Sequence, residues 1–70
     1  MKQTTEFGKA VKKKLVDLDQ TQRWLIDEVK SDTGLYFDSG YLHRILVGEE
    51  KTPSIITSIT KILDIEGWRN

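Results

Sequence analysis

Apolar side chains recur every three or four residues in separate stretches of this chain, and this periodicity restricts its fold more than any other feature. It is clearest over residues 5–18, where the spacing gives one side of a helix an apolar stripe made by Phe7, Val11, Leu15 and Leu18. The same spacing predicts helices over residues 22–30, 39–47 and from residue 53 onward. The sequence therefore predicts an all-α fold, a compact bundle of four to five short helices.

The residues between these stretches favour the same boundaries. Side chains that can cap a helix are found at the expected helix starts: Thr4 or Thr5, Thr21, Asp38 and Thr52. Pro53 suits the first position of a helix, and Gly48 suits the backbone just beyond a helix end. Gly34 ends a run of turn-forming residues, 31–34, and can adopt a positive φ. Residues 35–37 (Leu-Tyr-Phe) are too apolar for a free linker. We expect this segment to pack beneath the helices, with Leu35 or Phe37 against Trp24 or the third helix.

A chain of 70 residues is expected to form one domain, residues 1–70. A chain this short buries only about 60% of its unfolded surface, so the core must be used efficiently. Cysteine is absent, and no disulfide can reinforce the fold. The apolar pattern predicts a core of eight residues: Phe7, Val11, Leu25, Val29, Leu42, Ile45, Ile59 and Ile62.

Catalytic and metal-binding patterns are weak in this sequence. His43 is the single histidine, and without cysteine it cannot begin a tetrahedral zinc site. Ser39 and His43 are four residues apart and could touch on one helix face. A nucleophile and its base also need an orienting acid and an oxyanion site, and no residues suggest either. We therefore expect a protein that is not an enzyme and that needs no metal or cofactor.

The charges cancel in total, with eleven basic and eleven acidic residues, whereas strong nucleic-acid binders are usually basic. Their distribution is uneven: residues 1–14 are rich in lysine, whereas the charged residues among 15–38 are mostly acidic. Local patches rather than the total decide where a phosphate can bind. No apolar run approaches the roughly 20 residues of a membrane span, and the N-terminus lacks a signal-peptide core, so a cytoplasmic protein is expected.

Several short features occur in an order that resembles a known family. They are Phe7-Gly8 and Val11 in the first helix, Thr21-Gln22 at the start of the second, Tyr41-Leu42 in the third, and Gly48 and Pro53 around the last loop. In this order, residues 7–65 resemble the lambda-repressor-like, or XRE-type, helix-turn-helix regulators of phages and plasmids. The second and third helices would form the helix-turn-helix. Its turn would be extended over residues 30–36, which is longer than is usual in that family.

The resemblance implies a sequence-specific, repressor-like transcriptional regulator that places its third helix in the major groove of double-stranded DNA. The implied DNA contacts are Gln22, Ser39, Gly40, Tyr41, His43, Arg44, Lys51 and Thr52. Arg44 would bond the O6 and N7 edge of guanine, while Gln22 and Lys51 would hold phosphates. Gly40 weakens a helix, so a close approach to its backbone is expected. The length of the chain is similar to that of one-domain regulators of phages or mobile elements. The operator, the sign of regulation and homodimer formation are left open.

Some of these residues have a second interpretation. Tyr41 suits either a phosphate contact or the edge of the core. Trp24 suits either a cover for residues 35–37 or a contact with a partner, and Trp68 either folds back or serves a partner. With its charges balanced, the chain could instead be a protein-interaction module that binds a repressor, a polymerase or another DNA-acting protein.

Overall fold

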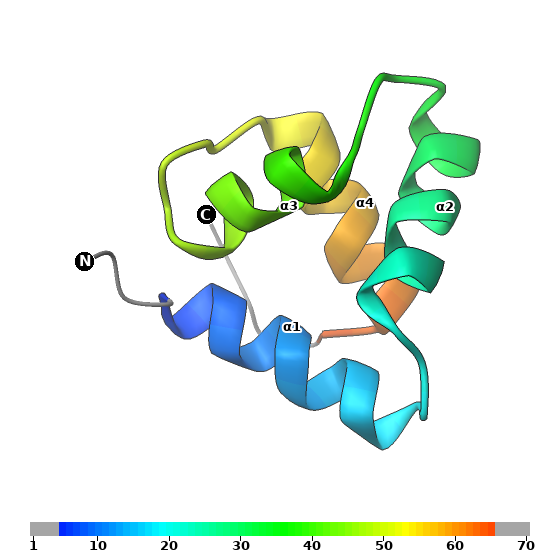
Figure 1. Cartoon of the computed structure of the whole chain (residues 1–70), viewed down its shortest axis with the longest axis vertical. Coiled ribbons are helices and arrows are strands. Elements are labelled where there is room, and N and C mark those ends of the chain that lie inside the picture. Colours follow the sequence, from blue (N-terminus) through cyan, green and yellow to red (C-terminus); the bar gives the residue numbers. More distant parts are fainter. Residues whose placement is uncertain (1–4, 66–70) are drawn as a thin grey trace.

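The computed structural model describes residues 5–65, and in this range the chain forms four helices and no strand (Figure 1). They are α1 (Glu6–Asp17), α2 (Gln22–Thr33), α3 (Ser39–Leu46) and α4 (Pro53–Leu63). In Figure 1, α1 lies across the bottom of the view and contacts α3 and α4, while α2 stands at one side and also contacts α3 and α4. The predicted all-helical class is confirmed. Each of these helices is too short or too polar to cross a membrane.

Three of the four predicted N-caps are confirmed. In each, a side-chain oxygen accepts a hydrogen bond at 2.8–3.0 Å from the backbone N–H three residues on: Thr5, Thr21 and Asp38. α4 begins differently. Thr52 occupies the cap position before Pro53, but its hydroxyl pairs with the hydroxyl of Tyr41 instead of the helix backbone. Local capping therefore fixes the start of three helices, and a tertiary contact replaces it at the fourth.

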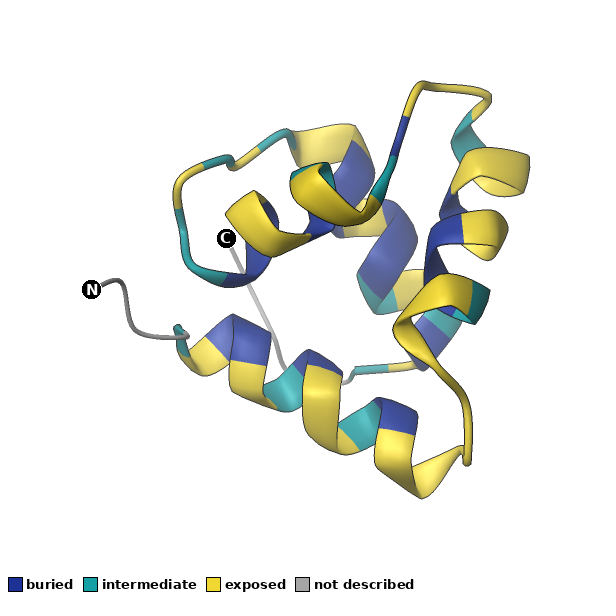
Figure 2. Cartoon of the chain, viewed as in Figure 1, coloured by how far each residue is buried: buried dark blue, intermediate teal, exposed yellow. Residues whose placement is uncertain are grey.

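One cluster of buried apolar side chains joins all four helices (Figure 2). Seven of the eight predicted core residues are buried in it: Phe7, Val11, Leu25, Val29, Leu42, Ile45 and Ile59. Ile62 is only half-buried, because α4 turns Ile55, Ile59 and Leu63 inward at spacings of four. Leu18 is 42% exposed instead of completing the apolar stripe, because α1 ends at Asp17 and the chain turns away there.

α2 is longer than predicted. It ends at Thr33 instead of Lys30, and Gly34 caps it in the left-handed conformation, with φ 70°. The positive φ predicted for Gly34 is confirmed, but the predicted turn over residues 30–36 is wrong in its boundaries. The connection from α2 to α3 covers residues 34–38. Besides this local glycine cap, the last turn of α2 makes a contact with α4 that the local sequence does not reveal.

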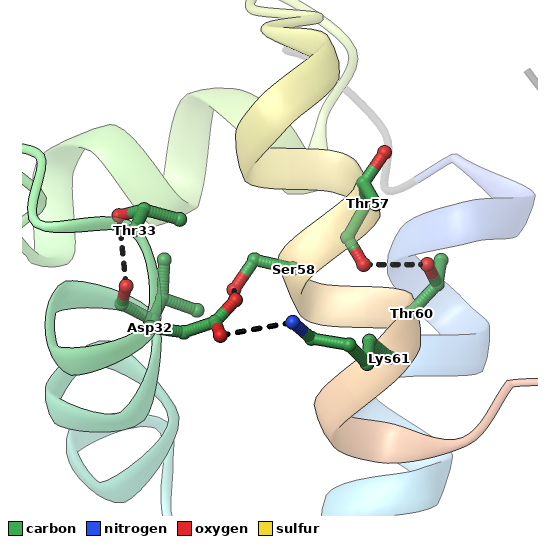
Figure 3. A network of polar contacts seen from close by, with 7 residues as sticks. Asp32, Thr33, Thr57, Ser58, Thr60 and Lys61 are labelled. Carbon is green, nitrogen blue, oxygen red and sulfur yellow. Dashed lines mark hydrogen bonds and ion pairs between the residues drawn. The ribbon is translucent and has the colours of Figure 1, made fainter.

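That contact joins the last turn of α2 to the middle of α4 (Figure 3). The buried Ser58 hydroxyl donates to Asp32 Oδ2 at 2.8 Å, and Lys61 Nζ lies 2.9 Å from Asp32 Oδ1. Asp32 would favour a turn in an isolated peptide, since its carboxylate competes for backbone N–H groups. Here both carboxylate oxygens are engaged by α4, and the last turn of α2 stays helical.

We expect Asp32→Asn to lower thermal stability at neutral pH and to have no effect in strong acid. The hydrogen bonds from Lys61 and Ser58 lower the pKa of the Asp32 carboxyl from its ordinary value. A folded-state pKa below the unfolded value stabilises the fold at neutral pH, and this contribution is lost as the pH falls through the folded-state pKa. Thermal melts between neutral pH and about pH 2 check this. The control is Glu28→Gln, on the exposed side of the same helix. An equal loss for Asp32→Asn at every pH would contradict the expectation.

The connection between α2 and α3 buries only one of its three large side chains. Phe37 is 1% exposed, and its ring lies 5.2 Å from that of Tyr41 in α3. The predicted packing of Phe37 on the third helix is confirmed. Leu35 and Tyr36 are 46% and 73% exposed, so the expectation that the whole segment packs beneath the helices is wrong. The segment leaves from the tip of α2, and the Tyr36 hydroxyl finds its partner, Asp38, at the surface.

Candidate nucleic-acid interface

The outward side of α3 is polar and exposed. Four of the residues predicted to contact DNA lie on it: Ser39, Gly40, His43 and Arg44. Positions three or four residues apart are neighbours on a helix surface, so His43 adjoins both Ser39 and Gly40, Arg44 adjoins Gly40, and the four form one continuous surface. The opposite side, with Leu42 and Ile45, is buried in the core. Figure 2 shows the exposed side of α3 facing the viewer.

Gln22 meets this surface at its N-terminal end. It is the first residue of α2, is exposed, and lines a shallow groove of about 360 Å³ together with Ser39, the first residue of α3. Charges of both signs line the same groove, and Arg23 Nε lies 3.6 Å from Asp27 Oδ1. The fold therefore brings the starts of α2 and α3 to one groove.

Lys51 belongs to the loop that follows α3. It is exposed in the loop between α3 and α4. The backbone N–H groups of Glu49 and Glu50 donate to the Arg44 carbonyl at 2.8 and 3.1 Å, which ties the loop to the end of α3. Lys51 is thus presented from a loop whose backbone is held against α3.

Tyr41 and Thr52 are bound to each other. The Tyr41 hydroxyl and Thr52 Oγ1 are 2.6 Å apart, and the half-buried Tyr41 ring packs on Phe37. Tyr41 therefore lies at the edge of the core, which was one of its two interpretations. Both residues stand beside the α3 surface, but their hydroxyls already have a partner within the protein.

Arg44 does not extend freely from α3. Its guanidinium carbon lies 5.5 Å from the centre of the Tyr41 ring, a distance typical of a cation–π contact. Its Nη1 atom lies 3.7 Å from the point that a Cβ atom of residue 40 would occupy, and Asp38 Oδ1 lies 3.7 Å from the same point. The Arg44 side chain is thus folded back along α3 toward the N-terminus of the helix.

Tyr36 and Asp38 belong to this surface, although neither was among the predicted contacts. The Tyr36 hydroxyl donates to Asp38 Oδ2, and Asp38 Oδ1 accepts the Tyr41 N–H at 2.8 Å. The hydrogen bond from Tyr36, and then that from the Tyr41 N–H, lower the pKa of the Asp38 carboxyl. The same bond raises the pKa of the Tyr36 hydroxyl. From the sequence, Asp38 was predicted only as a helix cap. Its hydrogen bond with Tyr36 joins residues two apart in irregular backbone, and such a bond has no periodic sequence pattern that would predict it.

The remaining candidates lie elsewhere. Trp24 is half-buried against the core, and Trp68, together with the predictions made for it, lies outside the described residues. Within residues 5–65, no group of three histidine, cysteine, aspartate or glutamate side chains is placed to hold a metal ion. Comparisons of the chain with protein-family models, curated proteins and solved structures find no match.

Proposed function

We propose that this protein binds double-stranded DNA in a sequence-specific manner and regulates transcription as a repressor-like factor. α2, the connection over residues 34–38 and α3 would form the helix-turn-helix, with α3 in the major groove, which is wide enough for a helix. One observation carries the proposal: the outward side of α3 is polar and exposed, with Gln22 in the groove at its start and exposed Lys51 in the loop that follows the helix.

Each part of this surface has a role suited to its chemistry. Arg44 would donate to O6 and N7 of a guanine, and Ser39 and His43 would bond neighbouring base edges. Gln22 would bind a phosphate at the start of α2, where backbone N–H groups and the helix dipole also favour an anion. Lys51 would bind a phosphate beyond the other end of α3.

Gly40 supports the proposal because nothing in the fold requires glycine there. Its φ is not positive, unlike those of Gly34 and Gly48. A Cβ atom at this position would meet only the side chains of Arg44 and Asp38, at an ordinary contact distance of 3.7 Å. Glycine inside a helix costs up to about 1 kcal/mol relative to alanine. A ligand surface that approaches the α3 backbone closely would explain its presence.

Gly40→Ala should therefore change stability and binding in opposite directions. The free energy of unfolding should rise by up to about 1 kcal/mol, which raises the melting temperature by a few degrees in a domain of this size. The affinity for a specific duplex should fall by about tenfold, because the added methyl group overpacks the contact with DNA. Thermal melts and titrations of one labelled duplex measure both effects. Unchanged affinity would remove the support that Gly40 gives to the proposal.

A salt titration with random duplex tests the DNA-binding proposal. Phosphate contacts release counterions, so the logarithm of affinity should fall linearly and steeply with the logarithm of salt concentration. Single-stranded DNA of the same length is the control, since α3 is proposed to require a major groove. An absence of duplex binding even at low salt would contradict the proposal.

The alternative function is a protein-interaction module. It is favoured by the exposed Leu35 and Tyr36 side by side in one loop, and by the balanced charge of the chain. Binding to a repressor or a polymerase through this loop would depend on Leu35 and would not need Arg44 or Lys51. If the chain binds no duplex, this alternative takes the place of the DNA-binding proposal.

A further inference from the structure

The Asp38 carboxylate is held rigidly at the start of α3. Oδ1 accepts the Tyr41 N–H at 2.8 Å, and Oδ2 accepts the Tyr36 hydroxyl, so rotation of the group would break at least one bond. Each carboxylate oxygen has two lone pairs and can accept a second hydrogen bond. Asp38 is half-buried, which leaves part of the group accessible beside the outward side of α3. It is therefore a fixed acceptor with unused capacity.

Arg44 supplies donors next to this acceptor. Its Nη1 atom and Asp38 Oδ1 each lie 3.7 Å from the position of a Cβ atom on Gly40, so the two groups flank a stretch of bare backbone. The Tyr41 ring beneath the guanidinium holds it on this side of the helix. The hydrogen bond from Tyr36 lowers the pKa of the Asp38 carboxyl most, and the Coulomb attraction of Arg44 lowers it further.

The fold does not require a negative charge at position 38. Asparagine caps a helix about as well as aspartate: its Oδ1 atom could accept the Tyr41 N–H, and its amide group could donate to the Tyr36 hydroxyl oxygen. An exposed attraction between opposite charges contributes little to stability. A fixed negative charge on a surface that contacts DNA lowers the affinity for phosphates. Its presence is therefore unfavourable for binding unless it increases the selectivity for one DNA sequence over others.

We propose that Asp38 is a specificity-determining residue, which acts with Arg44 to select a G·C base pair; the inference rests on the DNA-binding function proposed above. In the major groove, guanine presents two acceptors, N7 and O6, and cytosine presents a donor, the N4 amino group. The guanidinium of Arg44 would donate to the two guanine acceptors, and the neighbouring carboxylate of Asp38 would accept from the cytosine amino group. The Asp38 carboxylate would repel phosphates, and it would also repel any base that places an acceptor opposite it.

The test compares wild-type protein with Asp38→Asn on three duplexes. These are a site selected by the wild-type protein, the same site with the base pair recognised by Arg44 changed from G·C to A·T, and a random duplex. Asp38→Asn should bind the random duplex about fivefold more tightly, because one repulsive charge is gone. Its preference for G·C over A·T should fall by about tenfold. Asp17→Asn, which changes the net charge equally but lies on α1, should leave this preference unchanged.

Tyr36→Phe provides a second variant that keeps both the cap and the charge. It removes only the hydroxyl that fixes Oδ2, so the same preference should fall by a smaller factor, about threefold. Thermal melts of both variants establish that α3 is intact. If wild-type protein binds duplex but neither variant changes the preference, the role of Asp38 is wrong and the DNA-binding function stands. If wild-type protein binds no duplex, both proposals are wrong.

Discussion

Leu25→Ala should lower the free energy of unfolding by about 2–5 kcal/mol, which leaves a large share of so small a protein unfolded. Leu25 lies in α2, is fully buried, and belongs to the cluster that joins all four helices. The loss combines the transfer of the buried side chain to water with the cavity left behind. Alanine is the better helix former, so the loss cannot come from the helix propensity of α2.

Urea denaturation followed by circular dichroism measures this change. Leu35→Ala is the matched control, since Leu35 is 46% exposed in a loop, and it should alter the free energy by no more than about 0.5 kcal/mol. Ile45→Ala in α3 should resemble Leu25→Ala, because Ile45 is 2% exposed in the same cluster. Unfolding midpoints equal to that of the wild-type protein for both core variants would contradict this description of the core.

Arg44→Ala should cost about 1–3 kcal/mol of binding free energy at a single base position and relax the preference there, which is the signature of a lost contact with guanine. Variants of the selected site, each changed at one base pair, locate the affected position. Lys51→Ala should behave differently, because Lys51 is proposed to bind a phosphate. It should weaken binding to all sequences alike and reduce the salt dependence by about one counterion.

The two variants together separate base recognition from phosphate binding. They are measured on the selected site, its single-base variants and random duplex at several salt concentrations. Both residues are exposed, so neither substitution should disturb the core. If Arg44→Ala weakened every duplex equally, α3 would not be reading bases as proposed. If neither variant lost affinity, the interface would lie elsewhere.

The helix starts could be predicted because the interactions that make them are local. Thr5, Thr21 and Asp38 each bond a backbone N–H only three residues away. The same holds for the polar side of α3, where the periodicity separates exposed His43 from buried Leu42 and Ile45. Structural features that depend only on neighbouring residues could therefore be predicted from the sequence.

The errors arose where distant residues decide the structure. α2 continues past Lys30 because Asp32 binds Ser58 and Lys61, which lie 26 and 29 residues away. In α4, apolar residues are adjacent, and only the packing against the other helices selects Leu63 over Ile62 for the core. Neither of these long-range contacts is visible in the local sequence.

The candidate site was predicted in outline but not in its internal contacts. The exposed side of α3 follows from the helical period, and the structure brings Gln22 to the groove at the start of this helix. The folded-back position of Arg44 depends on the orientation of its side chain over Tyr41 and beside Asp38. Side-chain orientation is set by tertiary surroundings, so this part of the site required the structure.

Selection of bound sequences from a random duplex pool tests the central claim most directly. Wild-type protein should enrich a short motif that contains at least one strongly preferred guanine, and Arg44→Ala should lose the preference at that position alone. A motif that occurs twice with twofold symmetry would further indicate a homodimer on DNA. A pool that stays random after repeated rounds, with retention no better than that of a variant lacking both Arg44 and Lys51, would contradict the claim that this protein reads DNA sequence through α3.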